Sequence, residues 1–230
     1  ESKLFIMLQN INIFIHILFG TIAIFIGLAP YFTEKGGRYH RLFGRLFLGL
    51  MAVVLITALN GVLFFRDRPF LTIVTLLSFY TSYSGYRVLK TKEQGFTRQD
   101  FMVMLLVIGM AFYFVAHFQT ANILWHLSVV YYLLWYVFMI VGFDIIRYFF
   151  PKLIQIKKFW LYEHIYKMTA SFSALLSAGV GTVFSAYEPY NQIIPAMFST
   201  FLLIFCLLYF PRKMKGNFIS PHFLKKHCEN

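Results

Sequence analysis

Residues 101–143 form the feature that most limits the fold, because these 43 positions contain no Asp, Glu, Lys or Arg. A helix needs about 20 mostly apolar residues to cross a bilayer. The run is therefore too long for one membrane-spanning helix and matches the length of two. The polar residues Gln119, Thr120 and Asn122 lie near its centre, and we expect the turn between the two helices there.

Five further stretches without charged residues each predict one more span. They are residues 4–33, 46–65, 69–86, 168–187 and 189–210. The predicted fold class is all-α, a polytopic membrane protein built as a bundle of seven transmembrane helices. Only 13% of the residues are charged, about half the share of an average soluble domain, which excludes a soluble enzyme and a disordered chain. We expect a single seven-helix domain over residues 1–215 and a short basic tail over residues 216–230.

The formal net charge of +12 suggests a nucleic-acid partner until the basic residues are placed along the chain. Eighteen of the 21 Lys and Arg residues fall in the tail and in the segments after the first, third and fifth spans. Basic residues of this kind mark cytoplasmic loops. The pattern predicts an outside N-terminus and a cytoplasmic C-terminus. The expected partners are the lipid bilayer and its anionic headgroups, and no nucleic acid.

Five histidines in or at the edges of the predicted spans are the candidate cofactor-binding residues. His16 lies near mid-membrane, whereas His40 and His164 open the second and sixth spans at the cytoplasmic face. His117 and His126 flank the turn at the outer face. A bis-histidine haem takes two imidazoles from facing helices at one depth. The alternatives are headgroup contacts or helix caps for the interfacial histidines, and an interhelical hydrogen bond for His16.

Charged residues gather at the cytoplasmic ends of the spans. The candidate binding residues there are Arg41, Arg45, Arg87, Asp144, Arg147 and Lys167, with Glu163 beside them. Asp144 is the only acid inside an apolar stretch, so it needs a partner, and we expect Arg87, Arg147 or His40 to provide one. One interpretation is an ion-pair lock among spans two, three, five and six. The other is a pocket open to the cytoplasm, with a titratable Asp–His pair and an arginine for an anion.

Three sequence segments frame these residues. Residues 35–45 read K-G-G-R-Y-H-R-L-F-G-R, residues 84–89 read S-G-Y-R-V-L, and residues 164–168 read H-I-Y-K-M. Together they resemble a family of bacterial multi-pass membrane proteins of unknown function, frequent in Bacteroidetes, that carry K-G-G-x-x-H-R-x-x-G-[RK] and H-I-x-K-M. The resemblance covers most of the chain. It implies a protein of the bacterial inner membrane and supplies no reaction.

A more distant likeness, to membrane b-type cytochromes, rests on histidines carried by separate helices at two depths. It implies haem b as the cofactor, with no metal other than the haem iron. The chain is thus predicted to be a b-type haem or quinone-linked redox protein, with His40 and His164 as inner ligands and Arg87 and Asp144 behind them. The alternatives are a transporter or binding subunit for a small anion or lipid, and a non-catalytic accessory subunit. No H-E-x-x-H, C-x-x-C or G-x-S-x-G motif occurs, and whether the protein is an enzyme stays open.

Overall fold

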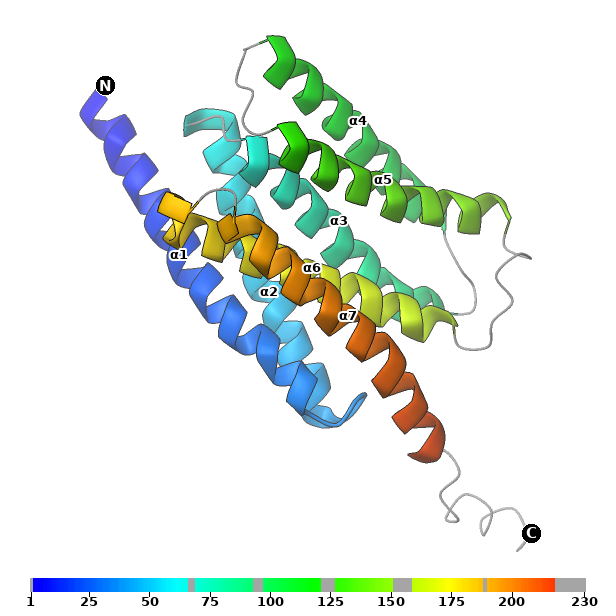
Figure 1. Ribbon diagram of the computed structural model, residues 1–230. Coiled ribbons are helices and arrows are strands. Elements are labelled where there is room, and N and C mark those ends of the chain that lie inside the picture. The colour runs from blue at the N-terminus through cyan, green and yellow to red at the C-terminus, as the bar shows by residue number, and fades with distance from the viewer. Residues whose placement is uncertain are drawn as a thin grey trace, which may run out of the picture.

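The computed structural model describes residues 2–65, 69–92, 97–120, 127–150, 159–187 and 190–217. These residues form one bundle of helices (Figure 1), and no strand occurs among them. The α-helices are α1 (Ser2–Phe32), α2 (Arg38–Asn60), α3 (Pro69–Thr91), α4 (Arg98–Thr120), α5 (Leu127–Phe149), α6 (Phe159–Val183) and α7 (Tyr190–Asn217). A π-helical segment, η1 (Gly61–Phe65), extends α2, and a 3-10 turn, η4 (Ser185–Tyr187), follows α6. The all-α fold class is confirmed.

Each predicted span corresponds to one helix. The long run without charges divides as expected, since α4 ends at Thr120 and α5 begins at Leu127. Four helices are long and apolar enough to cross a membrane, by length and composition. They are Lys3–Phe32, Arg38–Phe65, Arg98–His117 and Ile193–Phe210. The chain therefore has the helices of a membrane protein, while the full count of seven spans and the sides of the termini stay predictions.

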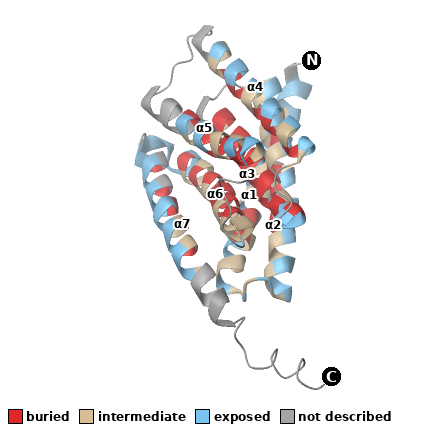
Figure 2. Ribbon diagram, turned by 90° about the vertical axis from the view of Figure 1, so that its right-hand side faces the viewer, coloured by how far each residue is buried: buried red, intermediate tan, exposed pale blue. Residues whose placement is uncertain are grey.

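Many large apolar side chains face outward, and polar side chains are buried inside the bundle beside its apolar cores. Phe14 of α1 is 66% exposed and Phe201 of α7 is 68% exposed, and Figure 2 shows exposed residues along α7. Inside the bundle, the hydroxyl oxygens of Ser82 on α3 and Ser171 on α6 lie 2.6 Å apart. An apolar exterior around a hydrogen-bonded interior fits a bundle surrounded by lipid.

Helix α6 occupies the middle of the bundle and packs against α1, α3 and α7. Its residue Ala174 belongs to the apolar core shared with α3, α4 and α5. Its residues Phe172 and Leu175 belong to a second core shared with α1 and α2. The close approach of α1 depends on Gly27, because a Cβ atom there would lie 2.8 Å from Phe172 Cδ2. The position of α6 is thus fixed from several sides.

The turn between α1 and α2 fixes where α2 begins. Gly36 has a φ of +77°, a conformation that glycine adopts without steric cost. The ammonium group of Lys35 donates to the backbone oxygens of Pro30 and Tyr31, the latter at 2.9 Å. These bonds satisfy carbonyls at the end of α1 that have no partner within the helix. The same ammonium lies 3.9 Å from the centre of the Phe210 ring on α7, so three helices are joined at this end.

Candidate functional site

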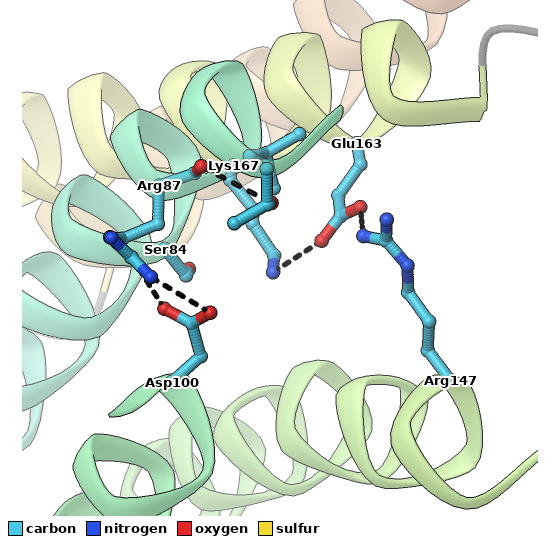
Figure 3. A pocket seen from close by; sticks show the side chains of 8 residues that line it. Ser84, Arg87, Asp100, Arg147, Glu163 and Lys167 are labelled. Carbon is cyan, nitrogen blue, oxygen red and sulfur yellow. Dashed lines mark hydrogen bonds and ion pairs between the residues drawn. The ribbon is translucent and has the colours of Figure 1, made fainter. Parts of the chain in front are cut away.

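Six charged side chains meet where α3 and α5 end and α4 and α6 begin, and Figure 3 shows all of them except Asp144. We call them the charge cluster. Its members are Arg87, Asp100, Asp144, Arg147, Glu163 and Lys167. The cluster contains three cations and three carboxylates, so its formal charge is zero. Charges away from water are stable only when they are paired and hydrogen-bonded, and the contacts described next meet that condition.

Lys167 is the centre of the charge cluster. Its side chain is 1% exposed, and its Nζ lies 2.8 Å from Asp144 Oδ2 and 2.9 Å from Oδ1. The same Nζ donates to Glu163 Oε1 at 2.7 Å, one helical turn earlier on α6. Asp144 is wholly buried and also accepts a hydrogen bond from the hydroxyl of Tyr80 on α3, at 2.5 Å. One lysine therefore joins two carboxylates and links α5 to α6.

Arg147 is the second cation that binds Glu163. Its guanidinium forms an ion pair with the second carboxylate oxygen of Glu163. It also donates to the backbone oxygen of Lys92 at 3.4 Å, just beyond the end of α3. Both oxygens of Glu163 are therefore engaged by cations. The predicted partners of Asp144 were wrong: the aspartate pairs with Lys167, while Arg147 pairs with Glu163.

Arg87 belongs to a separate pair with Asp100, the third residue of α4. Its Nε and Nη2 donate to the two carboxylate oxygens at 2.7 and 3.4 Å. Thr97 precedes α4 and donates to Asp100 through its backbone N–H at 3.0 Å and its hydroxyl at 2.6 Å. This is the reciprocal capping arrangement of a helix start, with Asp as the acidic residue. Arg87 follows the predicted third span, and the hydrogen bond to Asp100 raises its pKa above the ordinary value.

A small pocket lies within the charge cluster. Its volume is about 10 Å³, room for about one water molecule. Besides the charged residues, Ser84, Val88 and Thr91 line it. An added ion of either sign would lack a counter-charge here. The arrangement therefore acts as an ion-pair lock, and it joins α3, α4, α5 and α6 rather than the predicted set that included the second span.

A second group of polar residues lies on the other side of Gly85. His164 Nδ1 lies 2.9 Å from the backbone oxygen of Gly85, and His40 Nδ1 lies 3.3 Å from that of Pro30. A carbonyl oxygen only accepts, so each Nδ1 carries the proton. His164 is one of the groups that lower the pKa of His40, after burial of the ring, and we call the two residues the histidine pair.

The free atom of each ring is Nε2, which has no hydrogen-bond partner among the residues that the structure describes. His164 precedes the predicted sixth span, and burial lowers the pKa of its imidazole. A neutral ring with a protonated Nδ1 keeps a lone pair on Nε2. A backbone carbonyl that holds Nδ1–H is also the usual way in which proteins orient a histidine toward a metal.

The other candidate histidines lie elsewhere. His16 Nδ1 is 2.9 Å from the hydroxyl oxygen of Thr57 and 3.2 Å from the Val54 carbonyl, so the interhelical hydrogen bond expected as one alternative is present. The His117 ring stacks on Tyr113, with centroids 6.1 Å apart. His126 lies outside the described residues. The structure thus brings together only His40 and His164 among the histidines that it describes.

The arginines among the candidate binding residues do not gather at one site. Arg87 is held by Asp100, whereas Arg41 and Arg45 are exposed on the outer side of α2. The sequence-based prediction did not include Asp100, a member of the charge cluster, or Tyr80, which donates to Asp144. The spacing T-x-x-D at residues 97–100 is a helix-start signal that could have indicated Asp100. Nothing in the sequence distinguishes Tyr80 from the other tyrosines of the apolar stretches.

The chain matches no protein-family model, no curated protein and no solved structure. The family resemblance carried by the two motifs therefore stays a prediction. Within the described part of the chain, no three His, Cys, Asp or Glu side chains are grouped so that they could hold a metal ion. The candidate site consists of the histidine pair, and the charge cluster lies behind it.

Proposed function

We propose that the protein is a seven-span protein of the bacterial inner membrane, with its N-terminus outside and its C-terminus in the cytoplasm. The four apolar helices support insertion into a membrane. The one-sided distribution of Lys and Arg supports the orientation. In this arrangement the histidine pair and the charge cluster both lie near the cytoplasmic face.

Within that membrane, we propose a b-type haem or quinone-linked redox protein that binds its cofactor through His40 and His164. The supporting observation is the histidine pair itself, two imidazoles from α2 and α6 whose Nδ1 atoms are held by backbone oxygens and whose Nε2 atoms have no hydrogen-bond partner among the described residues. Neutral imidazole nitrogen is the ligand that haem iron takes from histidine. The same nitrogen could accept a hydrogen bond from the hydroxyl of a quinol.

The residues around the pair orient it. Pro30 and Gly85 hold the two Nδ1 protons through backbone oxygens, which fixes the tautomers and the planes of the rings. A Cβ atom on Gly85 would lie 3.1 Å from Lys167 Cβ, so α3 and α6 are in close contact at the level of His164. The ion pair of Lys167 with Asp144 joins α6 to α5, and the hydroxyl of Tyr80 on α3 donates to the same aspartate.

The test is the visible spectrum of the protein purified in mild detergent after haem has been supplied during expression. We expect a Soret band that shifts on addition of dithionite. His40→Ala and His164→Ala should each remove it, whereas His227→Ala, in the predicted tail, should leave it unchanged. A folded wild-type protein with no Soret band, and no response to dithionite, would exclude the haem form of the proposal.

The quinone form is tested on the same samples by equilibrium binding of a short-chain quinol. Loss of binding in His40→Ala and His164→Ala, with retention in His227→Ala, is the expected result. If neither haem nor quinol binds to the folded wild type, the redox proposal fails. The charge cluster then favours the non-catalytic accessory subunit, for which Asp144→Asn and His164→Ala change stability alone.

A transporter for a small anion or lipid has less support than the redox protein or the accessory subunit. Such a site needs cations that are free to meet the solute, and Arg87 is already neutralised by Asp100. The other two candidate arginines, Arg41 and Arg45, do not join Arg87, because their side chains lie on the exposed side of α2.

A further inference from the structure

The basic residues near the charged end of the bundle fall into two groups. Those of the first group have acidic or aromatic partners. They are Lys35, Arg87, Lys90, Lys92, Arg147 and Lys167. The second group includes Arg38, Arg41 and Arg45, the three arginines of the K-G-G-R-Y-H-R-L-F-G-R segment. These three are exposed, and none has an acidic or aromatic partner among the residues that the structure describes.

The three arginines occupy one side of the first two turns of α2. Their spacing of three and then four residues places them in one row on a helix. Arg45 Nε donates to the backbone oxygen of Arg41 at 3.3 Å, so the side chain of Arg45 is directed back toward Arg41. We call these residues the arginine row. Like charges at such spacings repel one another along a helix, and a bound anion would remove that repulsion.

The same side of α2 changes character directly after the arginine row. Ile56 and Leu59 are exposed apolar residues, and Gly49 has no neighbouring atom within 4 Å of where a Cβ would lie. No described helix covers this side of α2 there. Seven residues of helix cover about 10 Å, somewhat more than the 5–8 Å of headgroup region on one side of a bilayer. The arginine row therefore has the length needed to pass through the headgroups while the next turns meet acyl chains.

We propose that the arginine row binds the phosphate of an anionic phospholipid, whose acyl chains lie along the exposed apolar side of α2. Guanidinium groups bind phosphate oxygens through two parallel hydrogen bonds, which an ammonium group cannot do. Charge complementarity selects the anionic lipid over a zwitterionic one. The site is separate from the histidine pair, because His40 points to Pro30 while its three arginine neighbours are exposed.

The experiment measures binding of phosphatidylglycerol to the full chain in detergent by native mass spectrometry, with phosphatidylcholine as the neutral lipid. Each basic residue near a membrane surface changes such an affinity roughly fivefold. The triple variant Arg38→Gln, Arg41→Gln, Arg45→Gln should therefore bind phosphatidylglycerol on the order of 100-fold more weakly. The control is Arg98→Gln at the start of α4, which is exposed and basic but stands outside the row. It should change the affinity fivefold at most.

Several results would overturn the proposal. One is a folded triple variant that binds phosphatidylglycerol as the wild type does. Another is an Arg98→Gln variant that loses as much affinity as the triple variant, since the attraction would then be diffuse. Equal binding of phosphatidylcholine, or competition by millimolar inorganic phosphate, would also contradict it, because the site would then not select a lipid anion. Because all three side chains are exposed, the triple variant should elute as the wild type does in size exclusion.

Discussion

At the scale of the residue, Lys167 shows how a full charge can be buried in this bundle. Its ammonium contacts Asp144 and Glu163, and Tyr80 donates to the same aspartate. Breaking a buried pair by removing one partner leaves a charge without compensation and costs about 3–5 kcal/mol. If methionine replaces Lys167, the cost comes from the carboxylates left without a cation rather than from lost packing, because the two side chains have a similar length.

We therefore expect Lys167→Met to lower the free energy of unfolding by about 3–5 kcal/mol. The matched control is Lys90→Met on α3, whose ammonium lies over the Tyr86 ring at 4.8 Å on the exposed side of the helix. That change should cost about 1 kcal/mol at most. Unfolding by denaturant in detergent, followed by circular dichroism, gives both values. Equal losses in the two variants would contradict the role of Lys167 as the centre of the cluster.

At the scale of the element, glycines decide how closely the helices approach. Gly27 on α1 faces the rings of Phe47 and Phe172, which would lie 2.9 and 2.8 Å from an added Cβ. Gly109 on α4 has nothing within 4 Å of that position. Both glycines lie within helices, so substituting alanine at each position separates the effect of packing from the effect of helix propensity.

Gly27→Ala should destabilise the protein by about 1–3 kcal/mol, since two packed rings would have to move. Gly109→Ala should be neutral or stabilise the helix by up to about 1 kcal/mol, because alanine loses less backbone entropy than glycine. Thermal unfolding of the two variants side by side tests this pair. A stabilised Gly27→Ala variant would show that α1 does not pack on α2 and α6 as described.

At the scale of the whole molecule, the proposed orientation places η4 outside and the end of α3 inside. Tyr187 is exposed in η4, and Lys90 is exposed near the end of α3. In a chain whose own cysteines are replaced by alanine, Tyr187→Cys should react with a membrane-impermeant maleimide added to spheroplasts. Lys90→Cys should react only after permeabilisation. Labelling of both positions from the same side would exclude the seven-span arrangement.

The helices of this molecule could be predicted from the sequence, and their contacts could not. In a bilayer the length of an uncharged run determines a span, which is why the break between α4 and α5 falls at the predicted polar turn. The partner of Asp144 depends instead on how α5 and α6 are rotated about their axes. The predicted Arg147 follows Asp144 by three residues, whereas Lys167 follows it by 23 residues on another helix, and the packing of the helices brings the lysine to the aspartate.

The backbone bonds of the histidine pair also set how acid would affect a bound ligand. Since Nδ1 already carries a proton, a second proton can bind only at Nε2, the atom that the proposed cofactor needs. Ligand and acid therefore compete for the same lone pair, and acidification should displace the ligand. Burial lowers the pKa of His164, so its Nε2 stays free of that proton to a lower pH than in an exposed histidine. The surroundings that bury His164 thus extend the pH range over which the site can stay occupied.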